Sequence, residues 1–128
     1  MLNEIFGWLW ISVGFASGAL LGLRFDADGW LGGYGDLRRR LLRLGHIACV
    51  ALGMVNVLFA QSTLRQGLSP PVLETVSWLL LAGAVLMPVS CVLMAWRRGF
   101  KPLFAVPALA LLAGTVLLAL GKSEVLYP

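Results

Sequence analysis

Four long apolar runs, separated by short polar segments, dominate the pattern of the chain. The runs cover residues 5–23, 41–60, 72–96 and 103–120. An α-helix rises 1.5 Å per residue, so that about 20 residues cross the hydrocarbon core of a bilayer. A membrane barrel would need alternating polar and apolar residues, which these runs lack. Because hydrocarbon does not tolerate unpaired backbone amides, the pattern predicts an all-α, polytopic integral membrane protein with four transmembrane helices.

The connections predict how these spans are arranged. The segment 97–102 is so short that the third and fourth spans must be antiparallel neighbours. We therefore expect a four-transmembrane-helix antiparallel bundle. Asp36 and Ser69 are residue types that cap helix N-termini, and each precedes a span. Pro88 and Pro107 lie inside spans and are expected to bend them, because proline leaves a carbonyl without its N–H partner.

The composition agrees with burial in lipid. Hydrophobic residues make up 59% of the 128 residues and charged residues only 12%, whereas soluble domains carry about 45–50% apolar and roughly 25% charged residues. A short soluble chain could not bury so much apolar surface, because small domains hide only about two-thirds of the surface that the unfolded chain exposes. We expect a single transmembrane domain over residues 1–128, with aromatic side chains mostly near the membrane interfaces. These are Trp8, Trp10, Trp30, Trp78, Trp96 and Tyr34.

Basic residues predict the orientation of the bundle. Most of the ten Lys and Arg residues lie in loops 24–40 and 97–102 or just after the first of these: Arg24, Arg38, Arg39, Arg40, Arg43, Arg97, Arg98 and Lys101. Arg65 and Lys122 belong to the opposite side. Short loops rich in Lys and Arg stay in the cytoplasm, so both hairpin loops are expected there and both termini outside it. The expected location is the cell membrane, in particular a bacterial inner membrane.

The first span has a face of small residues. Gly14, Gly18 and Gly22 recur at every fourth position and form two overlapping G-x-x-x-G steps. Residues four apart share a helical face, and small residues on that face let another backbone approach closely. We interpret this face as a packing surface. It can serve another span of the same chain, a partner protein or a second copy.

The second span has the most polar stripe at membrane depth, formed by His46, Cys49, Gly53 and Asn56 on one helical face. Gly53 and Asn56 are candidate packing residues, since an amide can form hydrogen bonds across helices. An ionisable group inside a span is a candidate functional residue. Neutral imidazole binds haem iron and titrates near neutral pH, so His46 is a candidate axial ligand of haem b or a contact to a quinone.

Other features weigh against a cofactor. The chain has a single histidine, so a second haem ligand would have to come from a partner, a second copy or a methionine. His46 stands one turn after Arg43, where an imidazole can reach water or headgroups without binding anything. A metal site formed by His46, Cys49 and Cys91 is conceivable, but buried free cysteine usually packs as a small hydrophobe. We expect no metal, and the absence of a cofactor is the simpler interpretation.

No catalytic motif accompanies these residues. The sequence contains no Gly-rich phosphate loop, no H-E-x-x-H and no G-x-S-x-G, and we do not expect an enzyme. The favoured function is a non-catalytic accessory or structural subunit of a larger membrane complex, respiratory or photosynthetic. The alternative is a membrane redox anchor that binds haem b or quinone through His46. A small oligomeric channel or transporter is the third hypothesis.

The expected partners are membrane components. They comprise other membrane subunits or a second copy, and lipids that include anionic headgroups. Nucleic acid is not expected, because the basic residues stand in short loops between apolar runs rather than on a soluble face. The residues expected to contact headgroups or a partner are Arg38, Arg39, Arg40, Arg43, Arg97, Arg98 and Lys101.

Overall fold

The computed structural model describes residues 2–62 and 68–126, with side chains described except at 98 and 122–126. Within this part of the chain there are four α-helices: α1 (Leu2–Gly22), α2 (Leu37–Gln61), α3 (Pro70–Trp96) and α4 (Ala105–Leu126). Four helical segments are long and apolar enough to cross a membrane. This confirms the prediction of an all-helical bundle, and the four candidate membrane-spanning helices agree with a multi-pass membrane protein.

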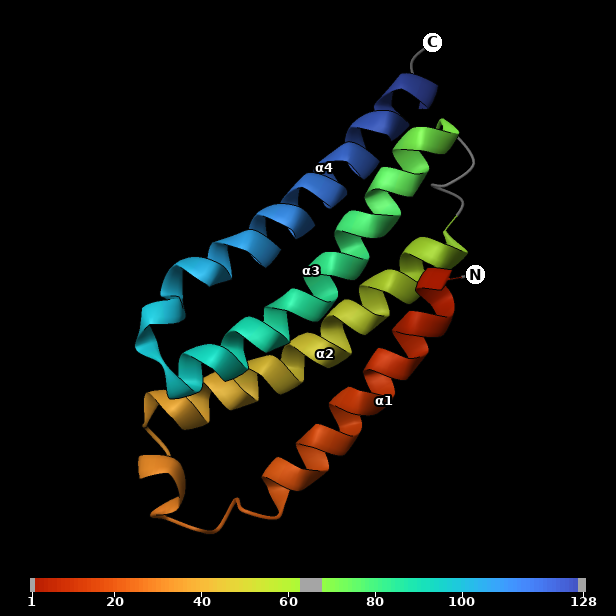
Figure 1. The fold of residues 1–128 in the computed structure, drawn as a ribbon. Helices are drawn as coiled ribbons and strands as arrows, with labels where there is room; N and C mark the ends of the chain where they lie inside the picture. Colours follow the sequence, from red (N-terminus) through yellow and green to blue (C-terminus); the bar gives the residue numbers. More distant parts are fainter. Residues whose placement is uncertain (1, 63–67, 127–128) are drawn as a thin grey trace.

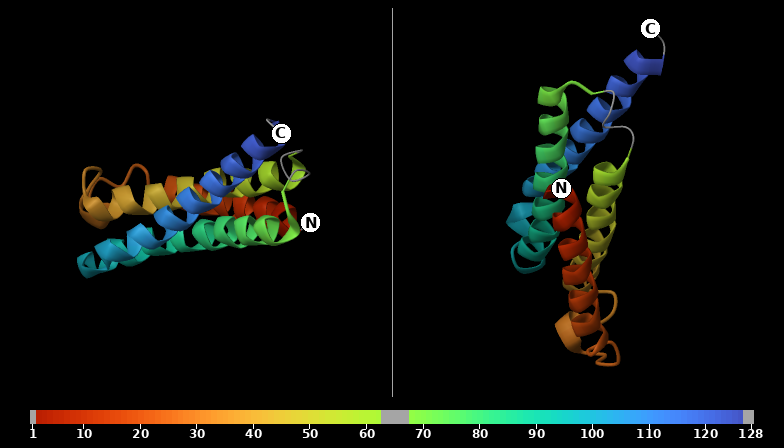
Figure 2. Two further views of the ribbon diagram at one scale, coloured as in Figure 1. Left: turned by 90° about the horizontal axis from the view of Figure 1, so that it is seen from above. Right: turned by 90° about the vertical axis from the view of Figure 1, so that its right-hand side faces the viewer.

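The helices pack in chain order and run antiparallel to their neighbours (Figure 1). Within the described residues, the extensive contacts join α1 to α2, α2 to α3, and α3 to α4, and a smaller contact joins α1 to α3. Figure 2 shows α4 crossing the other helices at an angle and lying at one edge of the bundle. The bundle is therefore open on the side where α4 and α2 diverge.

Both predicted hairpin loops lie at the same end of the molecule, and both termini lie at the other end (Figure 1). The first loop contains a short 3-10 helix, η1 (Trp30–Gly32), and the third connection is the 3-10 helix η3 (Arg98–Phe104). The basic residues of the two loops are thus gathered at one end. Arg65, assigned by the sequence to the other side, lies outside the described residues, as does the side chain of Lys122.

Helix α2 begins one turn earlier than the apolar run. Asp36 is its N-cap, and the Asp36 carboxylate accepts a hydrogen bond from the backbone N–H of Arg38 at 2.7 Å. The arginine run therefore forms the first turn of the helix, as the capping residue at position 36 predicted. Ser69 is the N-cap of α3, although its side chain makes no capping hydrogen bond; two prolines follow it, and a proline in the first turn needs no N–H partner.

The two prolines expected to bend helices differ in their position within the helix. Helix α3 continues through Pro88, which is buried. Helix α4 begins at Ala105, so Pro107 lies in its first turn. The first N–H groups of a helix have no intrahelical acceptor in any case, and proline is tolerated there. The expectation that Pro107 bends a helix is therefore wrong, because the helix starts later than the apolar run.

The most deeply buried side chains lie between α2 and α3. Phe59 of α2 packs with Val76 and Leu80 of α3, and these three are at most 5% exposed. Many apolar side chains elsewhere are exposed, such as Leu9 and Leu58 at 63% each. Exposure on this scale is the expected state of a helix whose outer face meets lipid.

Candidate functional site

Glycines of α1 bring its backbone against α2. A Cβ added at Gly7 would lie 2.6 Å from the carbonyl oxygen of Gly53, and one at Gly53 would lie 2.8 Å from that of Gly7. A Cβ at Gly14 would lie 3.0 Å from the backbone nitrogen of Val50. Side chains of any size at these positions would force the helices apart. The structure thus places Gly14 and Gly53 in the α1–α2 contact.

Gly18 and Gly22 differ in what they face. A Cβ at Gly18 would lie 2.9 Å from Nε2 of His46, and closer still to Cε1. Around Gly22 nothing lies within 4 Å. The expected G-x-x-x-G surface at 14, 18 and 22 is therefore displaced toward the N-terminus. Gly7, Gly14 and Gly18 form the contact, because α1 and α2 diverge toward the loop.

His46 is held by the backbone of α1. Its Nδ1 lies 2.7 Å from the carbonyl oxygen of Gly14 and 3.4 Å from Oγ of Ser17. A carbonyl only accepts hydrogen bonds, so Nδ1 carries the proton and donates it. In the neutral ring, Nε2 is then the bare acceptor. The half-buried imidazole therefore links two helices and also keeps one acceptor atom for another group.

This packing does not favour His46 as a haem ligand. The backbone at Gly18 lies against the Cε1–Nε2 edge of the ring. A porphyrin bound at Nε2 would require α1 to move away from α2 and to give up the close contacts at the glycines. His46 borders two cavities, so a group smaller than a porphyrin has room beside the ring.

The two cysteines are buried and free. Cys49 packs against Gly14, and Cys91 packs against Gly45. In the described part of the chain, no three side chains of the His, Cys, Asp or Glu type are placed to hold one metal ion. The structure therefore does not bring Cys49, Cys91 and His46 together as a ligand set.

A polar cluster joins three helices near the other end. Nδ2 of Asn3 donates to Oδ1 of Asn56 at 2.9 Å, and the Ser77 hydroxyl donates to Oδ1 of Asn3 at 2.5 Å. Asn56 is fully buried and also donates to the carbonyl of Leu52 at 2.9 Å. The predicted packing role of Asn56 is thus carried out with Asn3 and Ser77, two residues that the sequence analysis did not single out.

The register of the α1–α2 hairpin would predict the contact between Asn3 and Asn56. Gly7 faces Gly53, and in an antiparallel pair the residue one turn before Gly7 faces the residue one turn after Gly53. That pairing brings Asn3 to Asn56. The hydropathy pattern alone does not indicate this contact, because Asn3 precedes the apolar run 5–23 and resembles a residue that flanks a span.

Trp10 is a second residue placed differently from expectation. Trp10 lies half-buried in the middle of α1, where its ring stacks on that of Phe6 with centroids 5.2 Å apart. Its indole N–H donates to the carbonyl oxygen of Ala84 in α3 at 3.0 Å. Trp10 is therefore an exception among the aromatic side chains expected mostly near the interfaces, because the carbonyl of Ala84 satisfies its indole inside the bundle.

Arg39 is enclosed by its own chain. It is 3% exposed, and its guanidinium donates to the carbonyl oxygens of Phe25 at 2.7 Å and Ala27 at 3.4 Å. It also lies 5.6 Å from the ring centroid of Trp30 and 5.1 Å from that of Tyr34. This environment contradicts the expectation that Arg39 contacts headgroups. The carbonyls and aromatic rings of the first loop replace water and lipid around it.

The other basic residues of this end are more accessible. Arg43 is half-buried, with its guanidinium over the ring of Tyr34 at 4.3 Å. Five more are exposed: Arg24, Arg38, Arg40, Arg97 and Lys101. The side chain of Arg98 lies outside the described residues. A cationic surface is therefore present at the loop end, and Arg39 holds the first loop beneath it.

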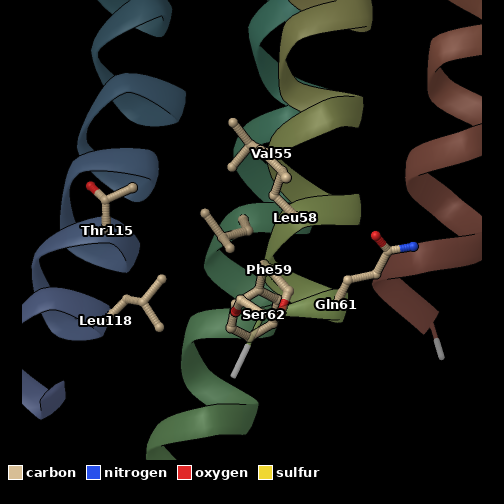
Figure 3. A pocket seen from close by; sticks show the side chains of 8 residues that line it. Val55, Leu58, Phe59, Gln61, Ser62, Thr115 and Leu118 are labelled. Carbon is tan, nitrogen blue, oxygen red and sulfur yellow. Dashed lines mark hydrogen bonds between the residues drawn. The ribbon is translucent and has the colours of Figure 1, made fainter. Parts of the chain in front are cut away.

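An apolar groove separates α2 from α4 near the end that carries the termini. It encloses about 340 Å³. Figure 3 shows Thr115 and Leu118 of α4 on one side and Val55 and Leu58 of α2 on the other. Phe59 also lines the groove. Among the described helices α3 is the main neighbour of α4, and the groove lies between α4 and α2.

Comparison of the chain with models of known protein families, with curated proteins and with solved structures gives no match. Any functional inference therefore depends on the geometry described above.

Proposed function

We propose that this chain is a non-catalytic accessory or structural subunit of a larger membrane complex, respiratory or photosynthetic, in the inner membrane of a bacterium. The observation that carries the proposal is the open groove between α2 and α4. Leu58 is 63% exposed on one wall, and Leu118 faces it from α4. The groove runs between two apolar helices that are long enough to span a membrane, and it suits an apolar helix of another subunit.

The chemistry of the groove supports a helix as its occupant. Association of helices in lipid depends on close packing and on hydrogen bonds between helices, since lipid tails are as apolar as leucine. The walls are almost wholly apolar, but Thr115 and Ser62 also line the groove. Their hydroxyls donate to backbone carbonyls of their own helices, and each retains acceptor capacity for a donor on a partner helix.

The basic end of the molecule supports the orientation within this proposal. The first loop with the start of α2, and the connection 97–102, carry most of the arginines, and they lie together at one end. Loops with an excess of Lys and Arg stay on the cytoplasmic side. Both termini would then lie outside the cytoplasm, and the exposed arginines would face anionic lipid or an acidic surface of a partner.

The test is isolation of the chain from its native membrane at native expression. In a mild detergent we expect it to migrate on a native gel with other membrane subunits in a fixed ratio. Leu58→Trp should fill the groove and release the chain from that complex. Leu9→Trp is the matched control, because Leu9 is also 63% exposed but lies on α1 away from the groove. A chain that migrates alone, or two variants that remain equally assembled, would overturn the proposal.

A further inference from the structure

A crevice opens between α1 and α3 toward the loop end of the molecule. The two helices touch where Trp10 bonds to Ala84. Closer to the loops, α1 and α3 form the walls of a cavity of about 300 Å³, and α2 forms its floor. The lining is mostly apolar and includes Val13 and Leu20 from α1, Leu42 from α2 and Val92 from α3. Leu20 is 67% exposed and Val92 is 44% exposed, so the crevice is open to surrounding lipid.

A smaller pocket of about 170 Å³ adjoins the crevice. The two cavities share Leu21, Trp30 and His46. The walls of the smaller pocket also include Arg39 and Arg43, which the crevice lacks. One molecule that spans both cavities would therefore have an apolar part among aliphatic side chains and a polar part beside the half-buried guanidinium of Arg43.

The smaller pocket carries positive charge without a carboxylate partner among the described residues. Arg39 donates to the carbonyls of Phe25 and Ala27, and Arg43 approaches the carbonyl of Tyr34 at 3.5 Å. A guanidinium has five N–H donors, so Arg43 retains donors for another acceptor. Phosphate oxygens match the guanidinium fork in both geometry and charge.

His46 stands where the two cavities meet. Its Nδ1 is engaged by Gly14, so that Nε2 of the neutral ring is an acceptor suited to a hydroxyl group. The guanidinium of Arg43 suits an anion, the imidazole of His46 suits a hydroxyl group, and the apolar crevice suits a hydrocarbon chain. A phospholipid with an anionic, hydroxyl-bearing headgroup combines these three features.

We infer that the crevice and the smaller pocket together bind one anionic glycerophospholipid, with an acyl chain between α1 and α3, the phosphate at Arg43 and a headgroup hydroxyl at Nε2 of His46. Basic pockets between transmembrane helices are suited to anionic headgroups. Inorganic phosphate has the same chemistry as the phosphate of the lipid headgroup but leaves the apolar crevice unfilled. The inference does not depend on the accessory-subunit proposal, which concerns the groove on the α2–α4 side.

The experiment measures binding of phosphatidylglycerol to the delipidated full chain in detergent by native mass spectrometry. Val92→Trp should block the crevice, and Arg43→Gln should remove the phosphate contact. The matched controls are Val89→Trp, because Val89 is 42% exposed on the same helix but does not line the crevice, and Arg40→Gln, which removes an exposed charge. Circular dichroism shows whether each variant retains its helices.

We expect one lipid per chain. Its binding affinity should fall by about tenfold or more in Arg43→Gln, since a hydrogen bond to a charged group contributes about 1.5–3 kcal/mol. It should fall by a similar factor in Val92→Trp, because the indole fills the crevice. The two control variants should bind as the wild type does. Equal binding by all four variants would show that the lipid associates with the protein surface without a specific site, and it would overturn the inference. It would also be overturned if phosphatidylcholine bound as tightly, if inorganic phosphate alone displaced the lipid, or if a neutral quinone were recovered from the crevice instead.

Discussion

The indole Nε1 of Trp10 donates a hydrogen bond to the carbonyl oxygen of Ala84, 3.0 Å away on another helix. Ala84 stands four residues before Pro88 in α3. In a regular helix the N–H of residue 88 would occupy this carbonyl, but proline has no N–H. Trp10 therefore satisfies a backbone acceptor that Pro88 leaves free. Ser90 donates to the carbonyl of Met87 at 2.7 Å in the same region.

This relationship predicts coupling between Trp10 and Pro88. Trp10→Phe should lower the free energy of unfolding in detergent by about 1 kcal/mol, the scale of hydrogen bonds between membrane helices. In a Pro88→Ala background the loss should shrink, because the alanine N–H can bond to Ala84 itself. A double-mutant cycle measures the coupling. Trp8→Phe is the control, since Trp8 is 56% exposed; equal losses with and without Pro88 would contradict the account.

The glycines of α1 predict unequal effects of adding one methyl group. Gly14→Ala should destabilise the protein by about 1–3 kcal/mol, as overpacking does, because the new Cβ would meet the backbone of Val50. Gly22→Ala should change stability by less than about 0.5 kcal/mol, since its surroundings are open. Thermal unfolding of the isolated chain measures both. Comparable losses at the two positions would show that Gly22 also lies in a packed contact.

The contacts of Arg39 with the first loop predict that this side chain keeps the loop folded. Arg39→Gln should release the loop, because buried contacts between a cation and aromatic rings contribute about 2 kcal/mol and two hydrogen bonds to loop carbonyls are lost as well. Limited proteolysis from the basic side should then cut residues 24–36 faster. The neighbouring Arg40 is exposed, so Arg40→Gln should leave the cleavage rate unchanged. Cleavage that is equally slow in both variants would mean that Arg39 does not anchor the loop.

The proposed orientation predicts which end reacts with a membrane-impermeant maleimide. In a background with Cys49→Ala and Cys91→Ala, Ser69→Cys should be labelled in intact cells. Ser69 is exposed and is the N-cap of α3, and α3 begins at the end opposite the basic loops (Figure 1). Lys101→Cys should react only after the membrane is permeabilised. The reverse pattern would place the arginine-rich end outside and would contradict the positive-inside assignment.

The sequence by itself determined the helical class, the number of spans and the gathering of arginines at one end. These properties depend on the composition of each segment, since hydrocarbon forces an apolar run of sufficient length into a helix whatever its neighbours are. The sequence also located the α2 N-cap at Asp36, because capping involves residues that are adjacent in the chain.

Only the tertiary structure decided which polar groups meet. The partners of Asn56, Trp10 and His46 lie on other helices, and their choice depends on the rotation and register of one helix against the next. Composition does not encode these quantities. Arg39 shows the same limit: it stands in a run with Arg38 and Arg40, and the fold of the first loop alone buries it. Equivalent residues in a sequence acquire different roles because packing gives each helical face a different environment.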